Sequence, residues 1–237
     1  MQVGRRDQNR REQVERILEA ARSLFGARGF ETVTMAEIAD EAGVARATVF
    51  NHFGSKAALV EGITEVVFSQ YIAMLEHALE LDTIPTATLV RALFEQMGAG
   101  IELSYGFYRG VFREMMKIQT GLDEGGAAAQ AGAEASARLQ RLLARGQERG
   151  DFSRRFSAAE LAHAFESLSN GTITRWLYDD ASGSLRERML TAAEIFLAPV
   201  ASGDRTDGPL PNLLPDAASA PVSTASPSGA ANKKRMR

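Results

Sequence analysis

The sequence predicts an all-helical protein of about nine helices. Apolar residues recur at spacings of three and four along most of the chain, which is typical of amphipathic helices. Capping sequences precede several of these stripes. Strand signals are lacking, because no sustained alternation of β-branched and polar residues occurs. A chain of 237 residues, 45% hydrophobic and 24% charged, has room for one ordinary domain or for a small domain joined to a larger one.

The first helices have clear boundaries in the sequence. From Arg11 onward an apolar stripe predicts an amphipathic helix, and Gly29 is expected to end it in the left-handed conformation. A second helix is expected after Thr34, because Thr34 and Glu37 have the spacing of a capping box, and Gly43 is expected to stop it.

A third, short helix over about 46–53 follows the turn, and Ser55 is expected to cap a long fourth helix. Two short helices separated by a Gly-containing turn, with a preceding helix to pack on, form the helix-turn-helix unit. The amino-terminal quarter of the chain is therefore predicted to be a three-helix domain of this kind.

The rest of the chain continues as helices and then changes in composition. The fourth helix is expected to cover 59–79, and further helices are expected over 85–103, 105–119 and 127–147 and behind the capping boxes Ser157-x-x-Glu160 and Ser184-x-x-Glu187. Six of the seven prolines lie after residue 198 among Ala, Ser and Gly, so the tail is expected to be disordered. The predicted division is 1–56 for the helix-turn-helix domain, 57–198 for a larger helical domain and 199–237 for the tail.

The net charge of −3 is unevenly distributed. It is +1 over the first part, −6 over the second and +2 over the tail. Residues 44–56 include Arg46, His52 and Lys56 and no acid, so a cationic surface can form there. Binding to phosphates depends on such a local patch, and the acidic remainder therefore does not exclude DNA as a partner.

The composition argues against an enzyme, a metal site and a membrane protein. The chain has no cysteine, which excludes disulfides, thiolate nucleophiles and sulfur-based zinc sites. Its three histidines lack metal-ligand spacing, and neither a nucleophile with a nearby base nor a Gly-rich phosphate motif occurs, so we expect no catalytic residues, metal or cofactor. No apolar run approaches the length that crosses a bilayer, and the polar amino terminus lacks the apolar stretch of a secretory signal, so a cytoplasmic protein without membrane contact is expected.

Three motifs lie between residues 17 and 59. They are Ala-Ala-x-x-Leu-Phe in the first helix, Thr-x-x-x-Ile-Ala-x-x-Ala-Gly-Val around the second, and Thr-Val-Phe-x-His-Phe-x-Ser-Lys from the third into the fourth. This segment closely resembles the DNA-binding domain of the tetracycline-repressor-like (TetR/AcrR) transcriptional regulators. The resemblance implies an all-α dimer of about nine helices, whose variable carboxyl-terminal domain binds a small molecule and dimerises through its last two helices.

The resemblance implies DNA contacts from the second, third and fourth helices. Arg46 is the candidate base contact, because its guanidinium can bond O6 and N7 of a guanine together; a phosphate contact is the alternative. Thr34 would present backbone N–H groups to a phosphate, or serve only as a helix cap. Lys56 lies at a helix start, where the dipole disfavours a cation, so a bound phosphate explains it better than helix stability. The candidate contacts are Thr34, Ala45, Arg46, Ala47, Thr48, Phe50, Asn51, His52 and Lys56.

The chain departs from the family pattern at three positions, with Ala45 where Ser is common, Ala47 where Gly is common and Phe50 where Tyr is common. Phe50 lacks the phenolic hydroxyl, so it is limited to sugars or a thymine methyl, and other groups must supply affinity. The arginines before the first helix would enter the minor groove, or form a frayed, solvated terminus; they are Arg5, Arg6, Arg10 and Arg11. The closing KKRMR adds non-specific attraction to DNA or has no role.

Aromatic residues and methionines are concentrated in the fifth and sixth predicted helices. Most are expected to pack in the core, but a subset suits an apolar pocket for an unidentified small-molecule effector. The candidate ligand-binding residues are Phe94, Met97, Tyr105, Tyr108, Phe112, Met116, Asn170 and Trp176.

Two apolar stripes in the last two helices suggest a homodimer. Paired across a two-fold axis they would form a four-helix interface; burial within one subunit is the alternative. The candidate interface residues are Phe165, Leu168, Gly171, Met189 and Phe196. A dimer holds two recognition helices at a fixed separation, which implies a roughly palindromic operator in double-stranded DNA.

The leading functional hypothesis is therefore a DNA-binding transcriptional regulator, most often a repressor in this family, that leaves its operator when a small apolar molecule binds the larger domain. The alternative is a DNA-bound dimer of the same fold that controls a protein partner, with the acidic body as its docking surface. An enzyme is the third class, and the residues give it little support.

Overall fold

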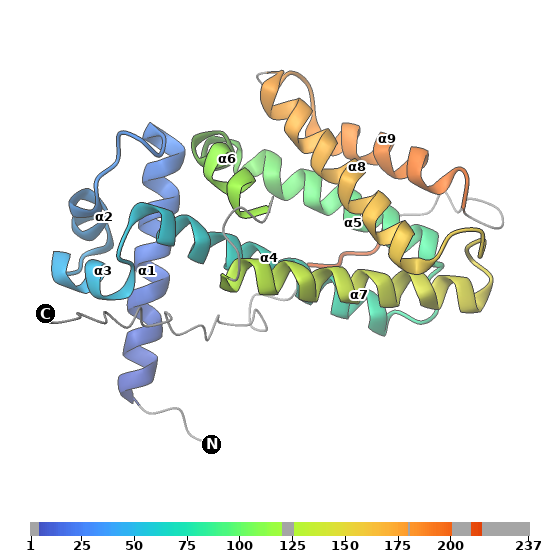
Figure 1. Ribbon diagram of the computed structural model, residues 1–237, viewed down its shortest axis with the longest axis horizontal. Coiled ribbons are helices and arrows are strands. Elements are labelled where there is room, and N and C mark those ends of the chain that lie inside the picture. Colours follow the sequence, from blue (N-terminus) through green and yellow to red (C-terminus); the bar gives the residue numbers. More distant parts are fainter. Residues whose placement is uncertain (1–4, 120–125, 180, 201–209, 215–237) are drawn as a thin grey trace, which may run out of the picture.

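The computed structural model describes residues 5–119, 126–179, 181–200 and 210–214 (Figure 1). These residues form nine helices and no strand, as the sequence predicts. The helices are α1 (Arg5–Arg28), α2 (Met35–Ala42), α3 (Arg46–His52), α4 (Lys56–Glu80), α5 (Thr86–Leu103), α6 (Tyr105–Gln119), α7 (Ala127–Arg149), α8 (Ala158–Tyr178) and α9 (Leu185–Leu197).

Local sequence signals set most helix ends. The Thr34 hydroxyl accepts a hydrogen bond from Glu37 N while the Glu37 carboxylate accepts from Thr34 N, and Ser157 and Glu160 do the same at α8. At α9 only half of the predicted box forms. Ser184 accepts from Glu187 N, but the Glu102 carboxylate of α5 accepts from the Ser184 hydroxyl and from the α9 backbone. The start of α9 is thus stabilised by a neighbouring helix.

Helices α1, α2 and α3 form a head with a small hydrophobic core of its own (Figure 1). Ile17, Ile38 and Val49 are fully buried in it, one from each helix. The same core includes residues of the first two turns of α4 and Phe107 and Val111 of α6. The packing boundary between head and body therefore lies within α4, beyond the predicted boundary at residue 56, because α4 and α6 supply one wall of the head.

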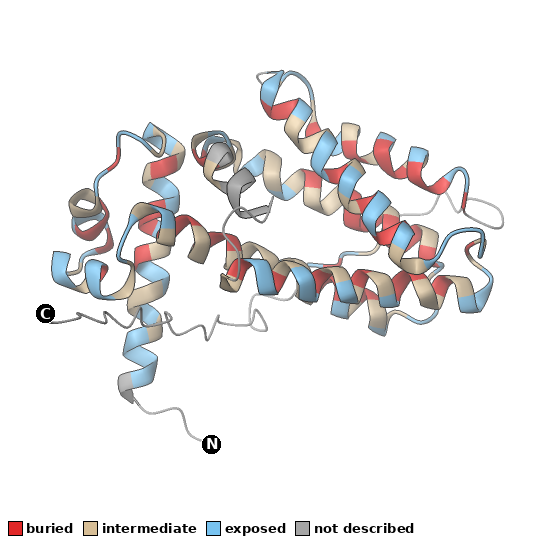
Figure 2. Cartoon of the chain, in the orientation of Figure 1, coloured by how far each residue is buried: buried red, intermediate tan, exposed pale blue. Residues whose placement is uncertain are grey.

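The body consists of α4 to α9. Helix α4 packs along α7, and α5 packs along α9, while α8 contacts both α7 and α9 (Figure 1). Figure 2 shows buried positions on the sides where these helices face one another and exposed positions on the outside. A second, larger hydrophobic core fills the body and draws residues from α4, α5, α7, α8 and α9.

The head and body meet where α1 crosses α6. Gly26 of α1 faces Gly106 of α6, and Gly110, one helical turn further along α6, faces Phe25 and Gly29. A Cβ added at Gly106 would lie 2.8 Å from Gly26 O, and one added at Gly110 would collide with Phe25 O. These glycines allow the two backbones to approach closely, and Phe30 N donates to Gly110 O at 3.3 Å across the same junction.

Two expectations differ from the structure. Among the described helices α4 is long and apolar enough to cross a membrane by length and composition, although a core helix of a soluble protein meets the same criterion. Its packing against α7, α6 and α1 accounts for its apolar character. In the tail that was expected to be disordered, residues 210–214 dock on the body, and Leu213 is fully buried in its core.

Candidate functional sites

The outward face of α3 carries most of the predicted DNA contacts. Val49 is fully buried and holds α3 against the head, so the residues around it point away from the core. The exposed positions are Ala45, Arg46, Ala47, Phe50 and Asn51, while Thr48 and His52 are half-buried. Ala45 makes no side-chain capping bond, as expected for an alanine. The head thus presents one face of a short helix with a cation, an amide and an aromatic ring to solvent, and the Phe50 side chain is 54% exposed.

Arg46 has one acidic neighbour on this face. Its Nη2 lies 3.7 Å from Oδ2 of Asp40 at the end of α2, and both side chains are largely exposed. An exposed ion pair at this distance contributes little to stability, so the guanidinium can exchange Asp40 for a base or a phosphate at small cost.

Thr34 is exposed, but its hydroxyl is already engaged in the α2 cap. Its Oγ1 donates to Glu37 Oε2 at 2.7 Å and accepts from Glu37 N at 3.2 Å. Arg28 Nη1 also donates to Glu37, at 2.7 Å from Oε1. The hydrogen bonds from Thr34 and Arg28 lower the pKa of Glu37 to about 2. A carboxylate that stays ionised beside this cap disfavours a phosphate there, so the capping role of Thr34 is the one the geometry supports.

Lys56 has a structural role that the sequence did not indicate. Its Nζ donates to Phe30 O at 2.6 Å and to Glu31 O at 3.1 Å, and it lies 4.7 Å from the centre of the Phe30 ring. The ammonium group therefore ties the start of α4 to the loop between α1 and α2. These contacts give a structural reason for a cation at this helix start, where the sequence favoured a bound phosphate over helix stability.

His52 is unlike a cationic phosphate contact. Partial burial, and then the positive charge of Arg10, lower its pKa below the usual value of 6.5. The imidazole is consequently neutral at pH 7 and can offer a phosphate a hydrogen bond but no charge.

The basic amino-terminal segment is part of a helix. Helix α1 begins at Arg5, so all four arginines belong to its first two turns, which corrects the expectation of an arm or frayed end before the first helix. These positions lie on an extension of α1 that projects beyond the rest of the head (Figure 1). The terminal KKRMR sequence lies outside the described residues.

Two of the candidate ligand-binding residues are core residues. Phe94 is fully buried, with its ring centre 4.3 Å from that of Phe165 and 6.1 Å from that of Phe196. Trp176 is buried, and its indole Nε1 donates to Gly183 O at 2.9 Å. Both side chains therefore pack within the subunit and leave no surface for a ligand.

The other ligand-binding candidates are half-buried against the core, exposed to solvent, or have side chains outside the described part of the chain. Met97, Tyr105 and Tyr108 are half-buried against the body core, and burial raises the pKa of Tyr108. Asn170 is exposed on the outer side of α8, so the structure contradicts its assignment to an interior pocket. Phe112 and Met116 fall within α6, but their side chains lie outside the described part of the chain.

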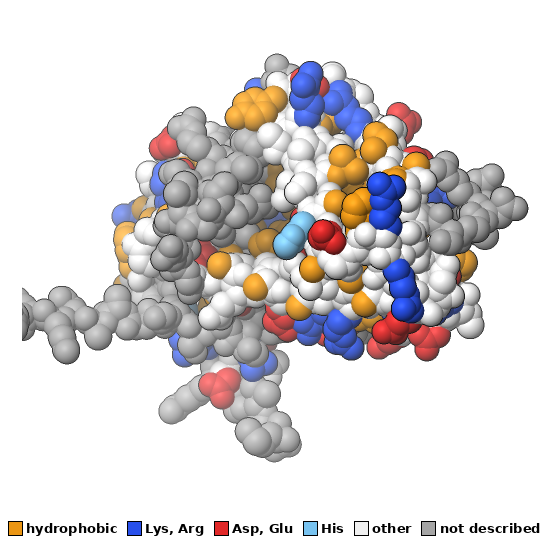
Figure 3. All heavy atoms as spheres, turned by 45° about the vertical axis from the view of Figure 1, so that its right-hand side comes forward, with side chains coloured by type: hydrophobic (Ala, Val, Ile, Leu, Met, Phe, Trp, Pro, Cys, Tyr) orange, Lys and Arg blue, Asp and Glu red, His pale blue; other side chains and the backbone are white. Residues whose placement is uncertain are grey.

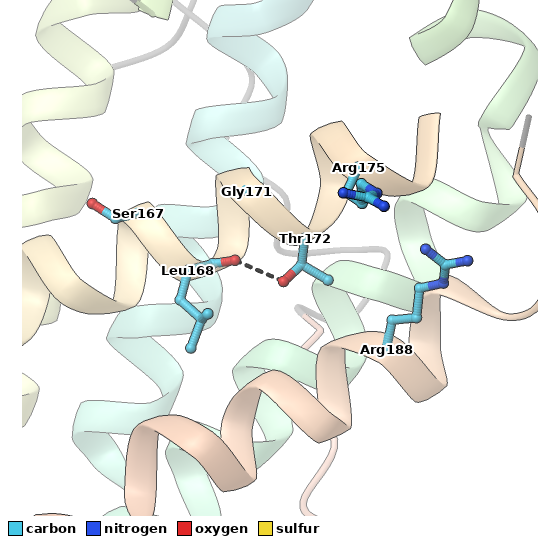
Figure 4. A pocket seen from close by; sticks show the side chains of 6 residues that line it. All are labelled: Ser167, Leu168, Gly171, Thr172, Arg175 and Arg188. Carbon is cyan, nitrogen blue, oxygen red and sulfur yellow. Dashed lines mark hydrogen bonds between the residues drawn. The ribbon is translucent and has the colours of Figure 1, made fainter. Parts of the chain in front are cut away.

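Three of the candidate dimer residues are buried in the core of the subunit, and two lie at its surface. Phe165, Met189 and Phe196 are buried in the core of one subunit, which corrects their assignment to an interface, because the apolar stripes of α8 and α9 face α5 and each other. Leu168 is half-buried and Gly171 exposed, and both line a shallow surface pocket of about 300 Å³. Figure 4 shows this pocket, with Ser167, Thr172 and Arg175 on α8 and Arg188 on α9.

The surface around this pocket includes residues that the sequence prediction missed. Ala164 and Ser167 form an exposed row of small side chains along α8 together with the predicted Gly171, and Ile195 of α9 is 61% exposed. In Figure 3 hydrophobic side chains gather on this side of the molecule between basic groups. The spacing of three and four between the small residues was visible in the sequence, but it lay beside a stronger apolar stripe.

No cluster of three metal-ligating side chains occurs among the described residues. The arrangement that does stand out is a helix-turn-helix head with an exposed α3, joined to a helical body. This defines the class of helix-turn-helix DNA-binding proteins.

Comparisons with known proteins agree with this class. A family model described as "Bacterial regulatory proteins, tetR family" matches residues 17–63. The HTH-type transcriptional regulator TtgW of Pseudomonas putida is 31% identical over 112 residues, which are 47% of this chain and 77% of TtgW. The HTH-type transcriptional regulator SrpR of Pseudomonas putida is also 31% identical over 112 residues, 47% of this chain and 48% of SrpR, so the match spans about half of SrpR. The nucleoid occlusion factor SlmA of Vibrio vulnificus is 34% identical over 93 residues, 38% of this chain and 46% of SlmA.

Solved structures share the whole fold at lower identity. The complex of SmeT with triclosan has a TM-score of 0.65 at 21% identity, covering 86% of this chain and 99% of SmeT. SmeT is the repressor of the Stenotrophomonas maltophilia multidrug efflux pump SmeDEF. FadR of Thermus thermophilus, in complex with lauroyl-CoA, has a TM-score of 0.60 at 23% identity, covering 83% of this chain and 98% of FadR.

The chain belongs to the TetR family of transcriptional regulators. Proteins of this family are DNA-binding regulators and not enzymes.

Proposed function

We propose that this chain is a cytoplasmic, ligand-responsive repressor. Its dimer binds a roughly palindromic operator, and a small apolar molecule bound in the body releases it. The observation that carries this proposal is the outward face of α3, where Arg46, Phe50 and Asn51 are exposed on a helix anchored by Val49. Such a face fits the major groove of B-DNA.

The proposed dimer forms through the outer surface of α8 and α9. Small residues such as Ser167 and Gly171 allow close approach of two helices, and Ile195 supplies an apolar contact. Two copies of this surface related by a two-fold axis would form an interface of four helices. The resulting dimer would hold two α3 helices at a fixed separation.

The effector is proposed to act through α4. This helix places Leu59 in the core of the head and Leu75 in the core of the body, so it belongs to both. A ligand that repacks the body core would move α4 and change the separation of the two α3 helices, provided that it binds the two arrangements with different affinity. Triclosan in SmeT and the acyl chain of lauroyl-CoA in FadR support an apolar effector, with half-buried Met97, Tyr105 and Tyr108 as candidate contacts.

The proposal is tested by selecting bound fragments from random and genomic DNA with the full chain. We expect a palindromic consensus whose affinity falls steeply with salt. Failure to enrich any sequence, at low salt and across protein concentrations, would refute a sequence-specific regulator.

Arg46→Ala tests the base contact within the same assay. If Arg46 contacts a guanine, the variant loses preference at one position in each half-site, by about 1–3 kcal/mol, and keeps its preference elsewhere. Arg141→Ala is the matched control, because Arg141 is an exposed arginine on α7 of the body and its removal changes the net charge equally. A uniform loss on all sequences would make Arg46 a phosphate contact instead.

A second candidate function is favoured by the match to the nucleoid occlusion factor SlmA. In this alternative the DNA-bound dimer controls a protein partner through its body, which carries most of the acidic residues. Many operator-like sites dispersed over a genome away from promoters would favour this function, whereas sites confined to promoters would favour the repressor.

A further inference from the structure

The body holds a short piece of its own tail as a bound peptide. Residues 210–214 lie against α5, and Figure 1 shows this segment, in orange-red, alongside that helix. We call residues 210–214 the tail segment. Leu213 is fully buried and belongs to the same hydrophobic core as residues of α4, α5, α7, α8 and α9. Leu210 is partly buried against this core, and Leu214 is 55% exposed.

One side chain of α5 binds the backbone of the tail segment. Gln96 Nε2 donates to Pro211 O at 2.7 Å, and Leu213 N donates to Gln96 Oε1 at 2.9 Å. Both hydrogen bonds are partly buried. The amide thus satisfies a carbonyl and an N–H two residues apart, while the Leu213 side chain fills the apolar space between helices.

These contacts define what the site accepts. If the tail segment leaves, Gln96 keeps a donor and an acceptor in a partly buried position, next to an apolar space the size of a leucine side chain. A replacement that excludes water from Gln96 must offer both a hydrogen-bond acceptor and a donor beside an aliphatic group, because a polar group left without a partner away from water is costly. An aliphatic chain that carries an amide meets all three requirements.

We propose that the tail segment is a tethered internal ligand and that the effector is an aliphatic amide that displaces it from Gln96. This inference rests on the proposed function, because it names the chemical class of the effector. The tail segment lowers the apparent affinity of the effector by occupying its site, since only the fraction of molecules with an open site can bind. Releasing the tail segment is then part of the response of the body core to the effector.

Leu213→Ala in the full chain tests the proposal, with octanamide as the probe. The variant keeps the backbone but loses the side chain that fills the site, so we expect octanamide to bind at least tenfold tighter than to the unaltered chain by isothermal titration. Leu214→Ala is the matched control, because it removes the neighbouring, exposed leucine and should leave the affinity unchanged. Equal affinity of the Leu213→Ala variant and the control would overturn the proposal.

The double variant Gln96→Leu with Leu213→Ala distinguishes the site from a simple apolar cavity. A simple cavity would bind octanamide equally in the Leu213→Ala variant and in the double variant. The proposal instead expects the tenfold gain in octanamide affinity to disappear when the Gln96 amide is absent. Retention of the gain would refute the role of Gln96.

A measurement on the unaltered chain covers the case in which a variant does not fold. Hydrogen exchange of the Leu213 amide should be slow without probe and should accelerate as octanamide is added, because displacement breaks its bond to Gln96. No acceleration at concentrations that saturate binding would overturn the proposal. These octanamide experiments contain no DNA, so their results can be interpreted even if the chain binds no operator. Failure to bind an operator would refute the proposed function separately.

Discussion

The Glu37 carboxylate shows how single residues connect the head. It accepts hydrogen bonds from the backbone and hydroxyl of Thr34 and from Arg28, so it joins the end of α1 to the start of α2. All of these bonds favour the ionised form, which explains the pKa of about 2. A carboxylate whose pKa is lowered by folding stabilises the fold at pH values above its unfolded pKa. This stabilisation is lost as the pH falls through the folded pKa.

We predict that Thr34→Ala raises the pKa of Glu37 from about 2 toward the ordinary value of 4.5, because it removes the hydroxyl whose hydrogen bond lowers this pKa most, while the backbone N–H of residue 34 remains. The stabilisation from Glu37 should be complete above about pH 4.5 and should decline toward pH 2 in the unaltered chain. Carboxyl carbon NMR measures the titration. Ser157→Ala, at the matching box of α8, should leave Glu37 unchanged, and a value near 4.5 in the unaltered chain would contradict the prediction.

At the scale of whole helices, the crossing of α1 and α6 determines how the head sits on the body. Three glycines bring the two backbones together, and Phe107 and Val111 of α6 complete the core of the head. A cleft of about 470 Å³ opens beside this crossing, lined by Gly26, Phe30 and Tyr105 among others. The junction therefore depends on the absence of side chains at particular helix positions.

Gly110→Ala is expected to destabilise the protein, although alanine favours helix formation by about 1 kcal/mol over glycine. The added Cβ collides with the Phe25 carbonyl, so the helices must separate, at a cost of about 1–3 kcal/mol. Thermal unfolding should show a lower Tm by several degrees.

Gly100→Ala is the matched control for that experiment. Gly100 is an exposed glycine of α5, and a Cβ there would meet nothing within 4 Å. Its Tm should stay the same or rise. If Gly110→Ala behaves like Gly100→Ala, the close approach of α1 and α6 is not required for stability.

For the whole molecule, the important division is between the buried and outward faces of α8 and α9. The apolar stripes that contain Phe165, Met189 and Phe196 close the core of one subunit. The outward face keeps small side chains, a shallow pocket and an exposed Ile195. An outward face of this composition suits contact between two copies, and a dimer is what a palindromic operator requires.

Ile195→Glu should therefore weaken the proposed dimer about 100-fold or more, because it would place an unpaired charge in the proposed apolar contact. Analytical ultracentrifugation over a concentration series measures the change, and operator affinity should fall with it. Leu103→Glu is the control, since Leu103 is a 90% exposed leucine at the end of α5 that does not line the pocket between α8 and α9. An Ile195→Glu variant that dimerises as tightly as the control would exclude this surface as the interface.

The sequence by itself determined the helices and the class of protein. Capping boxes such as Thr34 with Glu37, the left-handed Gly29 and the apolar stripes depend on residues a few positions apart, so their physical chemistry is present in any short stretch of chain. The three motifs of the head have the same local character, which is why the sequence alone indicates the family.

Only the tertiary structure decided which residues far apart in the chain are partners. It tied Lys56 to the loop before α2, buried Phe165 and Phe196 against Phe94 instead of a second subunit, and docked Leu213 on Gln96. An apolar stripe indicates that a helix face is buried but not what covers it, because the covering residues come from helices, or from a tail, 71 to 117 positions away.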